Sequence, residues 1–233
     1  PIVDIIIPKN SVNNRSYNAN WEANTYTITY DVNSGNELTV TKYQYTFDNS
    51  YTLPVPTKDY YNFVGWYYNG KLVESGKWTI ANDCTLTVKW SITNYNIYYN
   101  LDGGVNNSLN PNKYTYESDD IILQSPTKEG YTFVGWTSDN DITPTINLTL
   151  QHNSSEDITY TAHWKANSYT VTYDVNGGNE LVDDKLIVNF DSSYELTSPT
   201  RTGYTFVGWY YNNTLVSLNG TWSIANNCTL TAK

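Results

Sequence analysis

Three stretches of the chain alternate apolar and polar positions with a period of two. They lie at residues 26–32, 95–101 and 169–175, and Thr, Asn and Asp occupy most of the intervening positions. That period is typical of a β-strand with one buried face. Each stretch is followed by Asn-Ser-Gly, Asp-Gly-Gly or Asn-Gly-Gly. We therefore predict three half-buried strands that each end in a tight turn.

A second motif ends in Gly-Trp and also occurs three times. It reads PTKDYYNFVGW at residues 56–66, PTKEGYTFVGW at 126–136 and PTRTGYTFVGW at 199–209. The final tryptophans are 70 and 73 residues apart. A fixed period of this kind indicates repeated structural units.

A strand pattern that ends in Trp closes the first two units, at residues 85–90 and 159–164. The third unit stops at Lys233, which aligns with Lys89, so we expect Trp at the next position of a longer protein. Residues 1–21 align without a gap on residues 144–164, which indicates the end of a preceding unit. The predicted segments are the C-terminal tail of a preceding repeat at 1–23 and repeat modules at 24–92, 93–166 and 167–233, the last without its final Trp.

The first and third modules resemble each other more than the second, which indicates two alternating module types. Both contain Trp-Tyr-Tyr-Asn and one cysteine. The second module lacks counterparts of Trp78 and Cys84, and its stretch from Trp136 to Trp164 is longer, so we expect a longer loop or an altered strand there. Each junction has four residues and neither Gly nor Pro, whereas flexible linkers are rich in Gly and Ser. We therefore predict modules arranged head-to-tail as a semi-rigid rod.

Composition limits the function classes. The net charge of −10 and a charged fraction of 15% argue against nucleic acid and anionic lipid as partners. No run of 18 apolar residues is present, so we expect no membrane insertion. The negative charge suits a water-facing surface and discourages self-association, so we expect a monomeric rod. The sequence has no Met and no signal-peptide core, which suggests that it begins and ends inside a longer protein.

The Tyr-x-Phe-x-Gly-Trp motif, the closing strand that ends in Trp and the period near 70 together resemble the Listeria–Bacteroides repeat family, including the B repeats of internalins. The resemblance covers essentially the whole chain. It implies a β-rich α+β fold of tandem β-grasp-like (ubiquitin-like) modules, and an extracellular place on the bacterial cell surface or cell wall. It carries over no catalytic residues. Tyr60 departs from the pattern, because Gly130 and Gly203 stand at the same place in the other modules.

A module of about 70 residues buries little surface, so large aromatic side chains have to stabilise it. We place Phe63, Trp66, Trp90 and their equivalents in the core. Cys84 and Cys228 hold equivalent positions in different modules, beyond disulfide reach, and we interpret them as small buried apolar residues.

Other chemistry is weakly indicated. His152 and His163 have no metal-ligand or catalytic spacing, and we predict an exposed strand position for His163. Residues 31–36 faintly resemble a calcium loop but lack the downstream glutamate, so we favour an Asn/Gly hairpin turn. No Lys has a repeated buried position of the kind that an isopeptide cross-link to Asn needs. We expect no cofactor and no metal.

Exposed aromatic residues are the remaining candidates for ligand binding. Tyr68 with Asn69, and Tyr211 with Asn212, follow the Gly-Trp motif where a strand meets a turn. A Tyr there could stack on a sugar or contact a peptide. Cross-strand packing of aromatic side chains is the alternative that we favour.

The sequence therefore predicts a protein that is not an enzyme: structural or interaction repeats of a bacterial cell-surface adhesin that act as a semi-rigid stalk or spacer. One alternative is that the modules themselves bind a host surface protein or glycan. A second alternative is that they are accessory repeats of a secreted enzyme.

Overall fold

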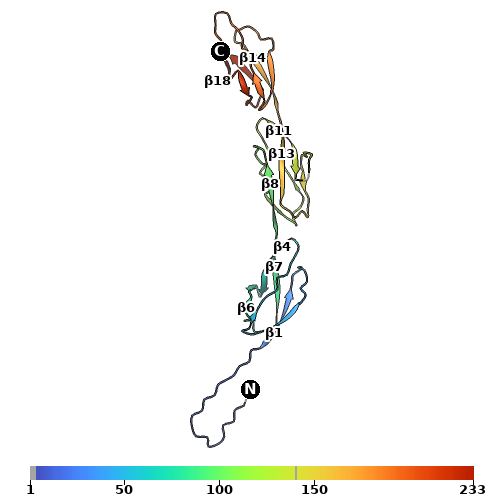
Figure 1. The fold of residues 1–233 in the computed structure, drawn as a ribbon, viewed down its shortest axis with the longest axis vertical. Helices are drawn as coiled ribbons and strands as arrows, with labels where there is room; N and C mark the ends of the chain where they lie inside the picture. Colours follow the sequence, from blue (N-terminus) through green and yellow to red (C-terminus); the bar gives the residue numbers. More distant parts are fainter. Residues whose placement is uncertain (1–3, 140) are drawn as a thin grey trace. The chain divides into compact units, whose positions relative to one another are not determined.

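The computed structural model describes residues 4–139 and 141–233, and every regular element in them is a β-strand (Figure 1). The prediction of a β-rich chain is confirmed. The α+β class is wrong for the described residues, because they contain no helix. In the first module Pro54 and Pro56 break the long connection before the Gly-Trp strand. Proline has no N–H to donate and clashes with the preceding turn inside a helix, so these two residues disfavour a helix in this connection.

The first module is built on a five-stranded sheet in the order β2-β1-β7-β4-β5. β1 and β7 are parallel, and all other neighbours are antiparallel. A separate ribbon of β3 and β6 lies outside this sheet. The strands are β1 Thr25–Asp31, β2 Lys42–Thr46, β3 Ser50–Tyr51, β4 Tyr61–Tyr68, β5 Lys71–Val73, β6 Gly76–Lys77 and β7 Cys84–Ile92.

The third module repeats this topology with the order β15-β14-β20-β17-β18 and a ribbon of β16 and β19. β14 is parallel to β20, as β1 is to β7. The strands are β14 Ser168–Asp174, β15 Lys185–Asn189, β16 Ser193–Glu195, β17 Trp209–Tyr211, β18 Thr214–Val216, β19 Asn219–Thr221 and β20 Cys228–Ala232.

The second module has a four-stranded sheet in the order β11-β13-β8-β9. Among the described residues, no hairpin strand follows the Gly-Trp motif as it does in the other modules, and Thr145 forms an isolated bridge to Trp136 instead. The expectation of an altered second half is therefore confirmed. The strands are β8 Asn94–Asn100, β9 Lys113–Thr115, β10 Ile121–Ile122, β11 Tyr131–Ser138, β12 Thr149–Leu150 and β13 Ile158–Ala166.

The chain forms two compact units, residues 1–93 and 94–233. The second unit contains the sheets of both the second and the third modules. Residues 4–24 contain no strand, and the side chain of Trp21 is 93% exposed. The assignment of residues 1–23 to a preceding repeat, and the module boundaries, stay predictions.

Each module has its own aromatic core on one face of its sheet. The tryptophans of the Gly-Trp motif, Trp66, Trp136 and Trp209, are fully buried, as predicted. The alternating strands also bury the predicted face, with Ile28, Ile97 and Val171 at the centre. The sequence reading did not place Trp78 and Trp222, which are also fully buried in the first and third cores.

Phe63 and Trp90 are only half-buried, which corrects the prediction that they lie inside the core. Trp90 covers one end of the module instead. Its Nε1 donates to the carbonyl of Val32 at 2.9 Å, and its ring meets Phe63 edge-on. Gly35 makes this possible, because a Cβ at that position would lie 2.5 Å from Cζ2 of Trp90. Packing against the core edge, with one side open to water, explains the partial exposure.

Candidate ligand-binding surface

The predicted ligand residues lie at two equivalent hairpins, β4–β5 and β17–β18. Tyr68 pairs with Lys71 and Tyr211 pairs with Thr214, so each hairpin loop has two residues. The first residue of each loop has positive φ, at 47° for Asn69 and 45° for Asn212. Such loops are the twist-matched turns in which Asn is strongly preferred. Backbone geometry therefore accounts for these two asparagines.

The two tyrosines are half-buried and pack against their module cores, so the expectation of an exposed ring is not met. The hydroxyl of Tyr68 accepts a hydrogen bond from Nδ2 of Asn82 at 3.1 Å. The hydroxyl of Tyr211 donates to Oδ1 of Asn226 at 3.2 Å. Each tyrosine thus fixes the loop that leads into the closing strand, in line with the packing interpretation.

The preceding tyrosines project differently and were not singled out by the sequence reading. Nζ of Lys89 lies 4.1 Å from the ring centre of Tyr67, and Nζ of Lys233 lies 4.3 Å from that of Tyr210. Each pair joins the Gly-Trp strand to the neighbouring closing segment. A cation over an aromatic face at this range is attracted by the ring quadrupole. These pairs could have been found in the sequence, because the Tyr-Tyr pair and the Lys recur at equivalent positions of the first and third modules.

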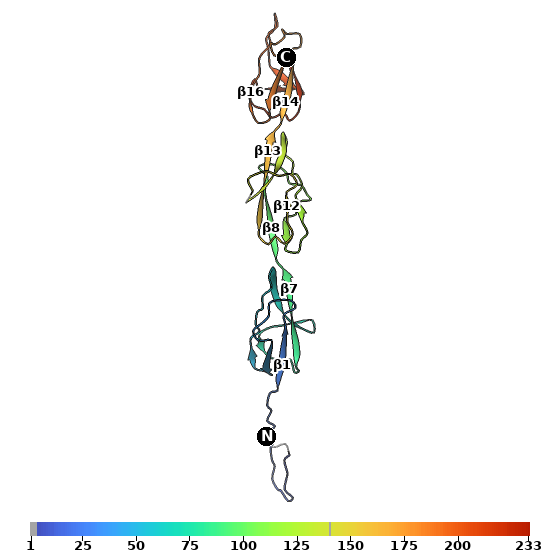
Figure 2. The same cartoon turned by 90° about the vertical axis from the view of Figure 1, so that its right-hand side faces the viewer.

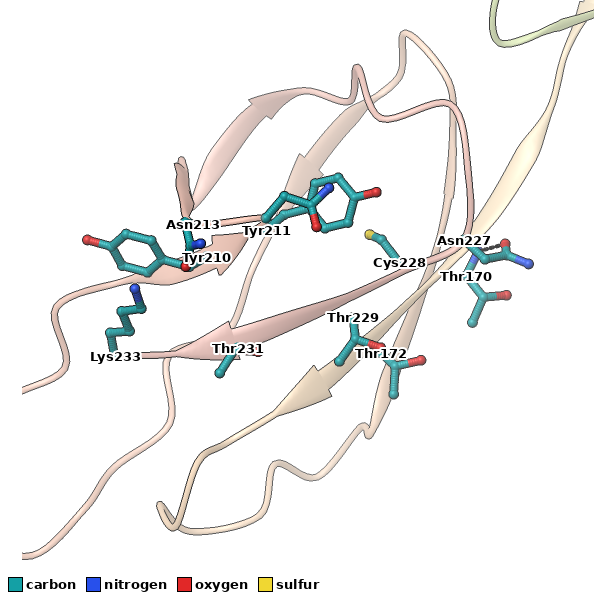
Figure 3. A pocket seen from close by; sticks show the side chains of 11 residues that line it. Thr170, Thr172, Tyr210, Tyr211, Asn213, Asn227, Cys228, Thr229, Thr231 and Lys233 are labelled. Atoms are coloured by element: carbon teal, nitrogen blue, oxygen red, sulfur yellow. Dashed lines mark hydrogen bonds between the residues drawn. The ribbon is translucent and has the colours of Figure 1, made fainter.

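Tyr210 and Lys233 border a groove of about 860 Å³ on the third module (Figure 3). Thr170 and Thr172 on β14 and Thr229 and Thr231 on β20 contribute their side chains to its floor. Tyr210, Tyr211, the hairpin asparagines, Asn227, Cys228 and Lys233 complete the lining. Hydroxyls, amides, two aromatic rings and one cation suit a neutral polar ligand with many hydroxyl groups.

The two cysteines are free thiols. Cys228 is 8% exposed and belongs to the third core, while Cys84 is half-buried against the first. Burial raises the pKa of both thiols, and the nearby carboxylate of Asp83 adds to the effect at Cys84. Their packing fits the interpretation of small apolar residues.

The histidines make hydrogen bonds within the second module. Nε2 of His163 lies 2.8 Å from Oγ1 of the buried Thr137, so His163 is half-buried and the exposed position predicted for it is wrong. Nδ1 of His152 lies 2.9 Å from the carbonyl of Ser118. Within residues 4–139 and 141–233, no group of three His, Cys, Asp or Glu is placed to hold a metal ion.

The faint calcium-loop sequence forms a turn. Oδ1 of Asp31 accepts from the backbone N–H of Asn33 at 2.9 Å, and Asn33 and Ser34 have positive φ. The turn is present, but the predicted hairpin is not tight, because β2, the antiparallel partner of β1, begins only at Lys42.

The Listeria-Bacteroides repeat domain matches residues 26–89, 95–163 and 169–233. The chain belongs to this family. The three matched ranges each contain one Gly-Trp motif and one alternating first strand, so the family motif and the repeated core coincide.

Relatives of this Listeria-Bacteroides repeat chain include much longer proteins. Two from Evansella cellulosilytica, named as a Gly-rich membrane protein and a membrane protein, are 31% and 32% identical over 84% and 82% of the chain. Internalin H of Listeria monocytogenes is 41% identical over 37% of the chain. The chain spans only 23%, 29% and 15% of the three relatives. No helix in the described residues is long and apolar enough to cross a membrane.

Proposed function

We propose that these modules form a semi-rigid stalk or spacer of an extracellular adhesin on the bacterial cell surface or wall, and that they have no enzymatic activity. The proposal rests on one observation: the module is repeated three times, and each copy encloses its own separate aromatic core. Elements that depend mainly on local neighbours can be added in series to set a length. The naming of relatives as membrane proteins and an internalin supports an envelope location.

We also infer that the module is a β-grasp-like unit without its helix. Support comes from the two complete sheets, in which the first strand and the closing strand form a central parallel pair. An antiparallel hairpin partner flanks the first strand, and the Gly-Trp strand flanks the closing strand. The central parallel pair brings the start and the end of each module together in one sheet.

The stalk proposal is tested by surface display. The chain is inserted once or twice between a wall anchor and a tip epitope, and binding of an antibody to the epitope is measured on intact cells. A Gly/Ser linker with the same number of residues is the control. Antibody access should rise with each inserted copy and exceed that of the linker, since a flexible chain gains reach only with the square root of its length. Equal access with the folded modules and with no insert would overturn the proposal.

The groove of Figure 3 favours a second candidate function, binding of a host glycan. A glycan array probed with the intact chain tests it, with Tyr210→Ala as the variant and Tyr67→Ala as the matched change outside the groove. Binding that only Tyr210→Ala abolishes would establish the site. Absence of binding across the array would favour a spacer with no ligand of that class.

A further inference from the structure

The second and third modules meet within the unit of residues 94–233, where β13 runs almost directly into β14 (Figure 2). Asn167 alone lies between the two strands. Its backbone N–H donates to the carbonyl of Gly130 at 2.9 Å, and its carbonyl accepts from the N–H of Phe190 at 2.9 Å. The linking residue is therefore hydrogen-bonded to the end of one module and to the start of the next.

Aromatic packing adds to these backbone bonds. The ring of Phe190 occupies the space beside Gly130, where a Cβ would lie 2.3 Å from Cγ of Phe190. The same ring meets Tyr131 edge-on, with 5.7 Å between ring centres and 76° between planes. Gly130 is buried by this arrangement. Any side chain at position 130 would have to displace Phe190.

A charge-assisted hydrogen bond completes the contact. The hydroxyl of Tyr131 donates to Oδ2 of Asp191 at 2.7 Å, and Nζ of Lys128 lies 4.3 Å from the centre of the Tyr131 ring. The bond to Asp191 raises the pKa of Tyr131, because the ionised phenolate would lose this donor and face a carboxylate. The backbone N–H of Asp191 donates to the carbonyl of Trp222 at 2.9 Å. This bond fixes the backbone that carries the Asp191 carboxylate within the third module.

The third module carries the same arrangement at its own far end. Gly203 has φ of 81° against 78° for Gly130. Cζ of Arg201 lies 4.0 Å from the ring centre of Tyr204, compared with 4.3 Å between Nζ of Lys128 and the ring centre of Tyr131. Here, however, a Cβ at Gly203 would meet no atom within 4 Å, and Tyr204 is 67% exposed. The φ of this glycine and the cation–ring contact are therefore kept without a neighbouring module, although the strand here begins only at Trp209.

The complementary half is present in the first module. Phe47 donates its N–H to the carbonyl of Asn24 at 2.9 Å, as Phe190 does to Asn167. Asp48 has φ of 62° and donates to the carbonyl of Trp78 at 2.9 Å, which matches the geometry of Asp191 and Trp222. All three modules have an aromatic residue followed by an acid at these positions: Phe47-Asp48, Tyr116-Glu117 and Phe190-Asp191.

We propose that Gly130 and Tyr131 form a socket, that Phe190 and Asp191 form a plug, and that their docking holds the second and third modules as one rigid pair. The exposed socket at Gly203 and Tyr204 then takes the plug of a following module of the same family, that is, an aromatic side chain followed by a carboxylate. This inference rests on the proposed stalk function, to which it adds the source of stiffness.

The test uses the intact, isotopically labelled chain and measures residual dipolar couplings and amide hydrogen exchange by NMR. Gly130→Ala is compared with Gly203→Ala, because both replace a glycine of nearly equal positive φ but only the first faces Phe190. In the wild type, one alignment tensor should fit the amides of both modules. Gly130→Ala should separate the tensors and speed exchange at Asn167 and Phe190 about tenfold, since aromatic pairs contribute on this scale.

Tyr131→Phe, with Tyr204→Phe as its control, should speed exchange at the same amides about threefold through loss of one hydrogen bond. Slow exchange at the core residues Trp136 and Val171 shows that both modules remain folded in each variant. Two tensors in the wild type, or equal effects of Gly130→Ala and Gly203→Ala, would overturn the docking proposal. Either result can be told apart from failure of the stalk proposal: a flexible array of folded modules still gives more antibody access than no insert, but it would no longer exceed the Gly/Ser linker.

Discussion

The first and second modules solve the same packing problem with different residues. In the first, Trp78 is fully buried and Leu86 faces Tyr30 across the parallel strands. In the second, the ribbon register places the exposed His152 where Trp78 stands, and Tyr160 takes the place of Leu86. We infer that the phenol of Tyr160, which is 2% exposed, compensates for the missing indole. The Gly-Trp tryptophan is therefore common to both cores, whereas the core residue at the centre of the closing strand differs between them.

The largest expected effect concerns the Gly-Trp tryptophan. Trp66→Ala should destabilise the first module by about 3–5 kcal/mol, through loss of burial and creation of a cavity. Trp21→Ala is the matched control, because that indole is 93% exposed, and it should change stability by less than about 0.5 kcal/mol. Urea unfolding followed through amides of the first module measures both. Similar losses from the two substitutions would contradict the assigned core.

The compensation is tested by reversing it. Tyr160→Leu should cost the second module about 2–4 kcal/mol, because no tryptophan fills the space that the smaller side chain leaves. Leu86→Tyr makes the opposite exchange and should cost the first module about 1–3 kcal/mol by overpacking beside Trp78. Urea unfolding of each variant gives the free energies. A neutral Tyr160→Leu would mean that Tyr160 does not replace the indole.

A smaller difference separates the two buried indoles of the first and third modules. Nε1 of Trp222 donates to the carbonyl of Ile224 at 2.8 Å, whereas Nε1 of Trp78 is buried with no partner among the described residues. Trp222→Phe should therefore cost about 1 kcal/mol more than Trp78→Phe, since only the former loses a hydrogen bond. Module-resolved unfolding compares the two, and the reverse order would exclude this account.

The smallest effect concerns thiol chemistry. The thiolate is the reactive form, and burial raises the pKa of both cysteines, so alkylation at pH 8 should be slower than in the unfolded chain. Because each pKa is raised, the rates should still climb above pH 9, where an ordinary thiol is already mostly ionised. Cys84, the more exposed, should react before Cys228. Mass spectrometry of the labelled peptides measures this order, and faster reaction at Cys228 would be inconsistent with it.

Local periodicity made part of this fold predictable. The alternation around Ile28 and the repetition of Trp66 report burial directly, since one face of a strand and one large side chain per unit have to be covered. The helix was wrong because it came from a family resemblance and not from residues; Pro54 and Pro56 already argued against it.

The remaining features depend on contacts between distant residues. Tyr131 and Asp191 are 60 positions apart, and no local pattern joins them. Half-burial of Phe63 and Trp90 likewise depends on how the sheet ends, which periodicity does not report. Asn69 and Asn212 were visible as turn residues, but only the hairpin register shows that the turn itself accounts for them.

The central claim is that each module closes its own core. Amide hydrogen exchange of the intact Trp136→Ala chain, resolved by residue, tests this most directly. The account predicts that slow exchange is lost at the second core, including Ile97 and Tyr160, and is kept at Ile28, Leu86, Val171 and Leu230. Simultaneous loss of protection in all three cores would show one cooperative fold and contradict the claim.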